Sequence, residues 1–322
     1  MYDNVSFYLE SHEVESINLL EEVLSNGSDI TVEKLGETGT GIPFGYVSIV
    51  GANNQKLTFK IFPYSIWMSG KNSSICKYYL GDNFQTLTLE DFNDAILNIS
   101  EKLGVDITKA RVSRIDLATN FYMEKDPSNY HSCLTHLSRF TRGAINGNLY
   151  FKTTQIELNF YDKKKEYRQK RVKIPEQFKE VENVLRYEIR FKKNISKLFK
   201  RKITISDLCG KEFFSELYHK WKSYYWNITK QNPIVFDSET TTMGTKDFKD
   251  YFFVQGMEAT GGVKVVYDII EKSKKAHTLT STKASYLRSV VSSAYSNPIL
   301  SVNYDYVEEL NDKMSNYELI LK

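Results

Sequence analysis

The sequence lacks several features that would place it in common protein classes. It has no apolar stretch of about 18 residues, so we expect no membrane span. Its first residues, Met1 to Asn4, do not begin a basic and then apolar leader, and no secretory signal is expected. Only three of the 322 residues are cysteines, and they lie too far apart for a zinc site or a disulfide framework. These absences favour a cytoplasmic, reducing environment.

Familiar catalytic motifs are also missing. The glycine-rich stretch from Gly36 to Gly41 has no Gly-Lys-Ser after it, so we expect a plain loop there rather than a phosphate-binding loop. There is no Gly-x-Ser-x-Gly elbow and no His-x-x-x-His metal pair. The five histidines are scattered along the chain, and each is expected to be structural or exposed.

The chain does have a local concentration of positive charge. Its net charge is only +3, but residues 162–202 hold 16 Lys and Arg against 6 Asp and Glu, which leaves 27 basic and 34 acidic residues elsewhere. Such a concentration is typical of a segment that binds a polyanion, although many charge runs are only solvated surface. We predict DNA contacts from the basic residues in and near this segment. They are Arg114, Lys165, Arg168, Lys170, Arg171, Arg186, Arg190, Lys192 and Lys193.

Three short segments, 113–118, 156–161 and 185–191, share a period-two pattern. In a β-strand, alternate side chains point to opposite faces, so each segment would present an apolar face and a polar face. The polar faces carry Asp116 in the first segment, Tyr161 in the second and Glu188 in the third. If the strands share one sheet, these three side chains gather on one surface.

This set suggests a metal-assisted attack by tyrosine on a DNA phosphate. Carboxylates are the ligands that Mg²⁺ or Mn²⁺ prefers, and mid-strand carboxylates are costly unless they have a use, so we predict that Asp116 and Glu188 bind one ion together. Tyr161 is the predicted nucleophile. Because a tyrosine has a pKa near 10, Lys163 and Lys164, or the metal, would have to ease the loss of its proton.

Other interpretations of the same residues stay open. Asp116 can instead pair with Arg114 or Arg186, and Glu188 with Arg190, in ordinary ion pairs. Most of the 22 tyrosines must be packing residues, and two of them are alternative nucleophiles. These are Tyr167 and, less favoured, Tyr150.

The order of predicted elements indicates an α+β protein, with an antiparallel sheet whose helices pack on one face, followed by a mostly helical C-terminal region. We divide the chain into a catalytic domain over 1–231 and a helical region over 232–322 that contacts DNA or a partner. The pattern predicts strands at 44–50, 56–62 and 74–80, and helices at 13–24, 89–103 and 126–140. Thr88 is the expected N-cap of the helix that Gly104 ends.

At this point the chain resembles a known family, the replication initiators of the filamentous-phage gene II type and the related gene II/X-like proteins. It is more distantly similar to the staphylococcal rolling-circle plasmid Rep proteins. The resemblance is carried by short motifs in collinear order over most of the chain. They are Val112-Ser113-Arg114-Ile115-Asp116, the strand that ends at Tyr161 before a basic stretch, Leu185-Arg186-Tyr187-Glu188-Ile189-Arg190, Phe59-Lys60-Ile61, Ile205-Ser206-Asp207-Leu208 and Thr282-Lys283-Ala284-Ser285-Tyr286.

The resemblance implies a rolling-circle nuclease core that nicks one strand of a double-strand origin. The family stays joined to the 5′ phosphate through a tyrosine, frees a 3′ hydroxyl as a primer and later rejoins the strand. It implies Tyr161 as nucleophile and Asp116 and Glu188 as metal ligands. The expected partners are double-stranded origin DNA and single-stranded DNA, with a host helicase or a second copy as further candidates, in the cytoplasm of a bacterial host. The alternative is a sequence-specific nucleic-acid-binding protein without enzymatic activity.

Overall fold

The computed structural model describes residues 1–70, 72–232, 235–236, 244–297, 300–301 and 304–318. The chain forms two compact units, which we describe one at a time. The first contains residues 1–124 and 143–223, and the second contains 125–142 and 224–317. Residues 125–142 and 224–231 belong to the same compact unit as the helices that follow residue 231. The predicted roles of 1–231 and 232–322 remain predictions.

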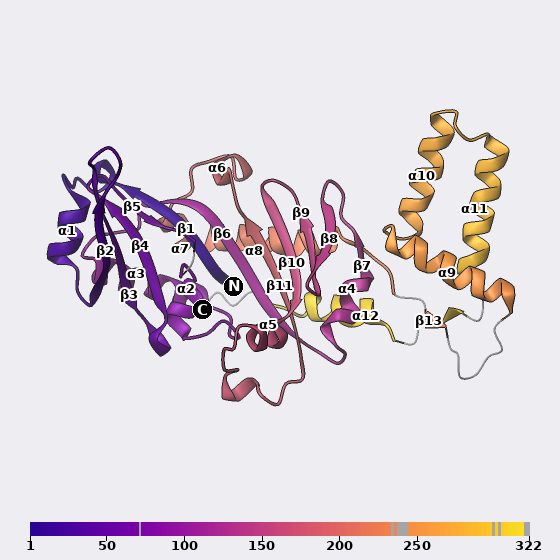
Figure 1. The fold of residues 1–322 in the computed structure, drawn as a ribbon, viewed down its shortest axis with the longest axis horizontal. Helices are drawn as coiled ribbons and strands as arrows, with labels where there is room; N and C mark the ends of the chain where they lie inside the picture. Colours follow the sequence, from indigo (N-terminus) through magenta and orange to yellow (C-terminus); the bar gives the residue numbers. More distant parts are fainter. Residues whose placement is uncertain (71, 233–234, 237–243, 298–299, 302–303, 319–322) are drawn as a thin grey trace. The chain divides into compact units, whose positions relative to one another are not determined.

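The first unit is built on a ten-stranded sheet, with strand order β2-β3-β4-β5-β1-β6-β11-β10-β9-β8 (Figure 1). The strand pairs with a defined register are all antiparallel. The strands are β1 (Tyr2–Glu10), β2 (Ile30–Glu37), β3 (Pro43–Val50), β4 (Lys56–Phe62), β5 (Ser65–Met68), β6 (Arg111–Met123), β8 (Thr141–Ile145), β9 (Asn148–Lys152), β10 (Ile156–Asp162) and β11 (Asn183–Phe191).

Short and long helices accompany this sheet, and the predicted α+β class is confirmed. They are α1 (Leu19–Asn26), α2 (Ile75–Leu80), α3 (Leu89–Leu103), α5 (Lys163–Gln169), α6 (Ile195–Leu198), α7 (Ile205–Cys209) and α8 (Lys211–Trp226), with single 3₁₀ turns η1 (Ser11–Glu13), η2 (Ala52–Asn54) and η3 (Glu176–Phe178). In Figure 1, α8 passes behind the sheet.

One face of the sheet is a continuous apolar core. Along the three patterned strands, the residues that alternate with the polar positions are buried, as the period-two pattern predicts. Phe160 of β10 stacks on Tyr187 of β11, with ring centroids 4.6 Å apart, and Tyr187 stacks on Trp221 of α8 at 5.0 Å. The Tyr187 hydroxyl donates to the Trp221 carbonyl at 3.1 Å, so the polar atom of this core ring is satisfied.

The opposite, polar face is not left open over its whole width. Around β1, β6, β10 and β11 it is covered by the segment from α2 to Asn83 and by α5. The Asn83 side chain donates to Asp3 of β1 at 3.2 Å and accepts from the Tyr167 hydroxyl of α5 at 2.9 Å. This cover explains why β10 is buried on both faces. The sequence-based expectation that helices leave one face free is therefore too simple here.

Several predicted elements agree with the structure, and others need correction. Helix α3 has the predicted bounds, with a capping box at Thr88 and a left-handed Gly104 (φ 69°). The strand predicted at 74–80 is wrong. This segment is α2, because the Ser74 side chain caps its first turn and the left-handed Gly81 (φ 85°) ends it. The helix predicted from residue 13 begins only at Leu19, and the one predicted to residue 140 ends at Cys133.

The second unit is mostly helical, as expected for the C-terminal part of the chain. Val254 and Met257 of α9, Ile270 of α10 and Val291 of α11 form a small core of their own. Within the described residues, no helix is long and apolar enough to cross a bilayer. The elements of this unit are α4 (Pro127–Cys133), β7 (Leu134–His136), β12 (Thr229–Lys230), β13 (Val235–Phe236), α9 (Thr245–Ala259), α10 (Val263–Lys275), α11 (Ser281–Tyr295), β14 (Leu300–Ser301) and α12 (Tyr306–Ser315).

Candidate active site and nucleic-acid interface

The strand register brings the predicted site residues together on the polar face. Strand β11 lies between β6 and β10, so each of its polar residues has a partner on both sides. Glu188 lies opposite Ala118 on one side and Asn159 on the other. The adjoining rows are Asp116–Arg190–Glu157 and Asn120–Arg186–Tyr161. Both predicted metal ligands and the predicted nucleophile thus lie within three consecutive rows of one surface.

Tyr161 and Glu188 are in direct contact. The Tyr161 hydroxyl lies 3.4 Å from Glu188 Oε2 and can donate its proton there. Tyr161 is only 6 % exposed, and burial raises the pKa of its phenol well above the usual value near 10, although the charge of Arg186 opposes this shift. The phenol is therefore protonated at neutral pH, and the adjacent carboxylate is the group placed to take the proton.

Asp116 is fully buried and sits in a network of opposite charges. The Arg114 guanidinium donates to both carboxylate oxygens of Asp116, at 2.7 and 2.5 Å. The Arg190 guanidinium lies 3.9 Å from Asp116 and 2.5 Å from Glu188. Burial, reinforced by the charge of Glu188, raises the pKa of Asp116 to about 6 in spite of the two arginines. The ion pairs that the sequence left open as an alternative are thus present for both carboxylates.

The same residues also suit a hard divalent cation. Asp116 and Glu188 offer carboxylate oxygens from adjacent strands, which are the ligands Mg²⁺ and Mn²⁺ prefer. Beside Glu188, the buried amide oxygen Oδ1 of Asn159 has no hydrogen-bond partner among the described residues, so one acceptor on this surface is left unsatisfied. An ion at this place would compete with Arg114 and Arg190 for the carboxylates.

A β-bulge in β1 supplies a buried acid that the sequence did not reveal. Tyr2 and Asn4 pair with the consecutive residues Leu117 and Asp116, so Asp3 is the extra residue between them. Its carboxylate lies 2.7 Å from the Arg186 guanidinium, and this charge outweighs the effect of burial and holds the pKa of Asp3 well below its usual value. Asn4 donates to Asp116 at 3.3 Å.

Arg186 differs from our prediction of a DNA contact. Its side chain is 3 % exposed, and its guanidinium also donates to the Asn83 carbonyl at 2.9 Å and to Asn120 at 3.2 Å. With these partners and Asp3, Arg186 ties the covering segment to the sheet. It fixes the strand row that contains Tyr161, but its charge does not reach the surface.

The two predicted catalytic lysines point to different places. Lys163 Nζ lies 5.8 Å from the ring centre of Tyr161 and 2.7 Å from Glu166. Burial, helped by Arg186, lowers the pKa of Lys163 to about 8, whereas Lys163 holds the pKa of Glu166 at about 2 against the effect of burial. Lys164 instead donates to the carbonyls of Lys179 and Val181, so the structure does not bring it to the phenol.

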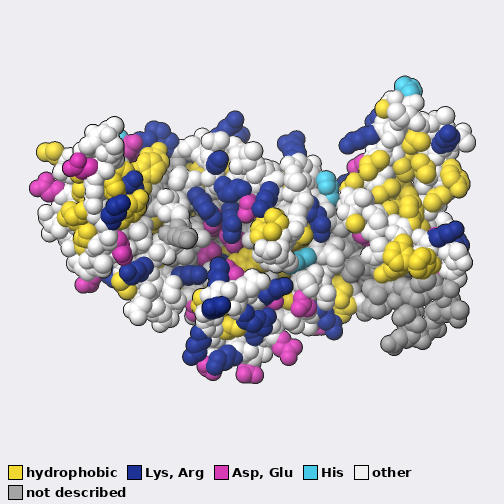
Figure 2. All heavy atoms as spheres, viewed as in Figure 1, with side chains coloured by type: hydrophobic (Ala, Val, Ile, Leu, Met, Phe, Trp, Pro, Cys, Tyr) yellow, Lys and Arg dark blue, Asp and Glu magenta, His cyan; other side chains and the backbone are white. Residues whose placement is uncertain are grey.

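The remaining predicted DNA contacts are mostly at the surface. In α5 and just after it, Lys165, Arg168, Lys170 and Arg171 are exposed, as is Lys193 after β11. Arg114, Arg190 and Lys192 are partly exposed and paired with carboxylates, Lys192 with Glu157 at 2.9 Å. Figure 2 shows basic side chains gathered over the middle of the sheet and over the region of α5.

A polar cavity of about 270 Å³ lies beside Tyr161 and Glu188. Both residues line it together with Arg190, and Lys77 and Lys170 add positive charge to its lining. Asp3, Asn4, Asn83 and Asn159 are site residues to which sequence reasoning assigned no role. Alternation places Asn159 on the polar face beside Tyr161, but no local motif marks Asp3, Asn4 or Asn83, because only the bulge and the covering segment bring them to this surface.

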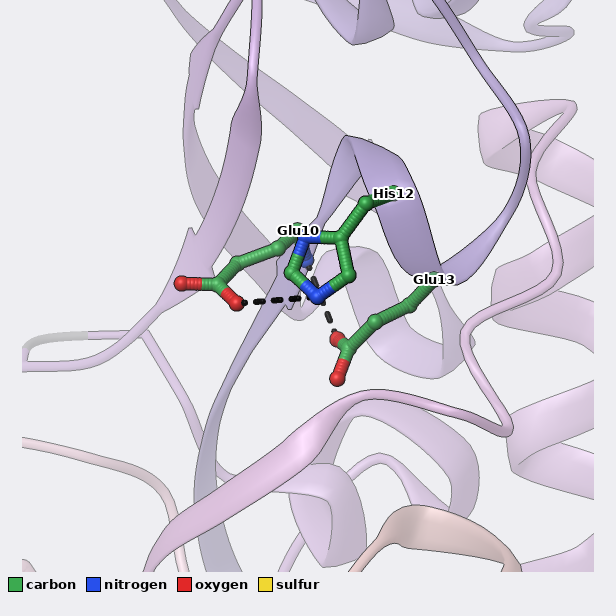
Figure 3. A group of neighbouring side chains, drawn as sticks. All are labelled: Glu10, His12 and Glu13. Atoms are coloured by element: carbon green, nitrogen blue, oxygen red, sulfur yellow. Dashed lines mark hydrogen bonds and ion pairs between the residues drawn. The ribbon is translucent and has the colours of Figure 1, made fainter.

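A second group of potential metal ligands lies at the end of β1. Ligand atoms of Glu10, His12 and Glu13 lie within 4.8 Å of one another (Figure 3). Arg111 already neutralises this group, since its guanidinium lies 2.8 Å from Glu13 and 3.7 Å from Glu10. His12 is 67 % exposed, as expected for a histidine outside the site. The cluster is therefore explained as a surface ion-pair group.

The alternative tyrosines are placed less favourably than Tyr161. The Tyr167 hydroxyl is committed to Asn83, and burial raises its pKa above the usual value. Tyr150 of β9 lies opposite Asn159 and is half-buried, with Lys152 Nζ 3.9 Å from its ring centre. Tyr150 remains the second candidate for a nucleophile on this face.

Comparison with known protein families identifies a match over most of the chain. Residues 1–223 match the family model for the N-terminal part of the phage replication-associated protein of the gene II type. The matched part includes the whole ten-stranded sheet and every residue of the site above. Among curated proteins, none matches the chain.

Proposed function

We propose that this chain, which belongs to the family of phage replication-associated proteins of the gene II type, initiates rolling-circle DNA replication by nicking one strand of an origin through Tyr161. Family membership supports a role in phage DNA replication, with DNA as the partner. One observation carries the finer proposal. The buried Tyr161 phenol donates to the Glu188 carboxylate, 3.4 Å away, and both groups line a polar, partly basic cavity.

The chemistry follows from the positions of these groups. As the Tyr161 oxygen attacks the phosphorus, its proton passes to Glu188. The bond from phosphorus to the 3′ oxygen breaks, and that oxygen takes up a proton from water and leaves as a free hydroxyl. The 5′ phosphate stays on Tyr161, so the bond energy is kept. In the reverse reaction a 3′ hydroxyl loses its proton to water as it attacks the phosphotyrosine. The bond from phosphorus to the Tyr161 oxygen then breaks, Glu188 returns the proton to the phenol, and the strand is rejoined.

Charge on the phosphate must be balanced during this transfer. Arg190 and Lys170 line the cavity and can approach the non-bridging oxygens, and Lys163 adds a buried positive charge near the phenol. A Mg²⁺ or Mn²⁺ ion held by Asp116 and Glu188, with the free Asn159 oxygen, would supply further positive charge there when bound. Without an ion, Arg114 and Arg190 orient the two carboxylates.

The decisive experiment uses supercoiled DNA that carries the cognate origin. The chain is incubated with Mg²⁺ or Mn²⁺, and a denaturing gel detects strands linked to protein. We expect an adduct with the wild-type chain and none with Tyr161→Phe, which should still bind the DNA. Tyr150→Phe is the matched control and should form the adduct. Normal adduct yield with Tyr161→Phe would remove Tyr161 from its role.

The second candidate function is DNA binding without cleavage. It is favoured by the ion pairs on both acids and by the burial of Tyr161, which are also the properties of a purely structural network. It predicts salt-sensitive binding with no metal requirement and no cleaved strand. Contacts with a host helicase, a homodimer and a location in the bacterial cytoplasm remain further predictions.

A further inference from the structure

The solvent-facing side of the N-terminal half of the sheet carries a row of alternating basic and aromatic residues. The strand register places Tyr46 between Lys34 and Lys60, and Trp67 between Lys60 and Tyr8. Arg111 follows opposite Tyr8 on β6. The row therefore crosses six strands. It lies on the same face as Asn4 and Asp116, because Asn4 and Tyr8 are both even-numbered positions of β1 and the bulge within β1 precedes Asn4. A second register shift, at Ser6 and Phe7, places its extra residue, Ser113, in β6 and leaves the alternation of β1 unchanged.

The members of this row contact one another closely. Tyr8 and Trp67 stack with ring centroids 4.8 Å apart and planes only 17° from parallel. Trp67 donates its indole N–H to Ser65 at 2.8 Å, which fixes the ring orientation. Lys60 Nζ lies 5.6 Å from the ring centre of Tyr46 and 4.6 Å from that of Phe62 in the next row. Stacking and the indole hydrogen bond thus fix the orientation of Trp67, and the Lys60 ammonium lies close to the rings of Tyr46 and Phe62.

These side chains remain accessible although they are aromatic. Trp67 is 41 % exposed, and a cavity of about 450 Å³ lies beside it. This cavity is lined by Tyr46, Thr58, Lys60, Phe62, Trp67 and Ser69. In Figure 2, hydrophobic side chains interrupted by basic ones cover the region of β2 to β5. Cross-strand pairing alone would explain the contacts, but it would not explain why an indole stays exposed beside the lysine-bearing strand β4.

We infer that this row, Lys34, Tyr46, Lys60, Trp67 and Tyr8, is a platform that binds single-stranded DNA by stacking bases on its rings. The choice of DNA as the nucleic acid rests on the proposed function. Unpaired bases expose the flat surfaces that aromatic side chains stack on, whereas the bases of a duplex are stacked on each other. The row itself contains no acid to pair with Lys34 and Lys60, which can approach the phosphates, so the surface complements a polyanion in charge as well as in shape.

The platform is expected to tolerate any sequence. Its rings offer stacking surfaces and its lysines offer charge, whereas base recognition needs hydrogen-bonding groups aimed at base edges. Lys56 of β4 lines the site cavity and Lys60, four residues further along the same strand, lines the platform cavity, so both cavities reach β4. A strand held at the nicking site can therefore continue over the platform.

The test measures binding of a labelled oligothymidylate to the full chain in EDTA, by fluorescence anisotropy. We expect Trp67→Ala to weaken binding at least about five-fold. Trp226→Ala is the matched control, because Trp226 is 44 % exposed and has Lys230 at 5.4 Å, but belongs to α8 rather than to the sheet. It should change the affinity less than about two-fold, and Trp67→Phe should restore much of the binding. Thermal melting verifies that each variant is folded.

A second measurement does not depend on altering Trp67. In a Trp226→Phe chain, the remaining tryptophans are Trp67 and the buried Trp221, so added oligothymidylate should quench the fluorescence of the exposed indole. Absence of quenching at saturating oligonucleotide would overturn the proposal. So would equal affinity of folded Trp67→Ala and wild type, or displacement of the oligonucleotide by duplex DNA as readily as by single strands.

The outcome is separable from that of the proposed function. Binding in EDTA does not require nicking, and nicking is read from protein-linked strands on a gel. If the chain binds through Trp67 but never forms an adduct, the platform proposal is supported and the nicking proposal is contradicted. If the chain forms the Tyr161 adduct but Trp67→Ala binds normally, the nicking proposal is supported and the platform proposal is contradicted.

Discussion

The two halves of the polar sheet face carry similar residue types, but other elements cover one half and the other half is open to solvent. On β6 and β11, the Asp116 and Arg186 side chains are almost fully buried, and the segment that ends at Asn83 covers Arg186. On β2 to β5, the row of lysines and rings is open to solvent, with Trp67 41 % exposed. Strand β1 lies between the halves and contributes to both.

This difference separates the residues proposed for catalysis from those proposed for DNA binding. Enclosed charges act at low effective dielectric, so each one must be paired and each pair strongly affects its neighbours. Exposed rings and lysines interact weakly with one another and remain free to hold a ligand. Residues of one half should therefore control catalysis and stability, and those of the other half should control affinity.

The largest effect is expected from Glu188→Gln. The amide cannot take the phenol proton, so adduct formation should fall on the order of 10²- to 10⁴-fold, while oligothymidylate binding in EDTA is retained. Initial rates of adduct formation and anisotropy titrations measure the two quantities. Equal losses in both would contradict the separation of the halves.

Breaking the enclosed pair of Asp3 and Arg186 should strongly destabilise the fold. Asp3→Ala leaves a buried guanidinium without its counter-charge, and we expect a loss of about 3–5 kcal/mol in the free energy of unfolding in urea. The matched control is Glu33→Ala, which breaks the exposed pair with Lys56 on the other half of the sheet. It should leave the urea midpoint within error. Comparable midpoint shifts in the two variants would refute the contrast.

The low pKa of Lys163 makes stability depend on pH above neutrality. Its pKa is about 8 in the folded chain against an ordinary value of 10.5, so between these pH values the unfolded chain binds more protons. Stability should therefore rise with pH across this window, by on the order of 3 kcal/mol from this group. The wild-type urea midpoints minus those of Lys163→Met isolate the effect. A flat difference from pH 8 to 10.5 would argue against a buried, shifted lysine.

The smallest effect is expected from Lys60→Gln in the open half. Removing one phosphate contact should weaken oligothymidylate binding a few-fold and lower the slope of log affinity against log salt by about 0.7. Adduct formation at saturating DNA should stay unchanged. Anisotropy titrations at several salt concentrations measure the slope, and an unaltered slope would show that Lys60 does not meet a phosphate.

The sequence predicts elements best where the local signal is strong. Helix α3 has both an amphipathic pattern and capping residues, and strands β10 and β11 alternate regularly, so their positions agree with the structure. The segment Ile75–Leu80 is rich in residues that favour strands, and its end caps outweigh that preference. Strand β2 escapes prediction, because it buries neither face and shows no alternation.

The candidate site is only partly predictable for a different reason. Alternation identifies Asp116, Tyr161 and Glu188 as polar-face residues, but their proximity depends on the order β6-β11-β10, which no local pattern specifies. The role of Asp3 depends on a bulge and on an arginine far away in sequence. The open row likewise takes one residue from each of several strands, so it leaves no motif in the chain.

Strand β1 fixes the distance between the candidate site and the aromatic platform. Asn4, which touches Asp116, and Tyr8, which stacks on Trp67, are four residues apart on one extended segment. At ~3.3 Å per residue their separation is roughly 13 Å. A continuous β-strand neither stretches nor bends easily, so this separation stays fixed. A DNA strand that contacts both surfaces must therefore span at least this distance.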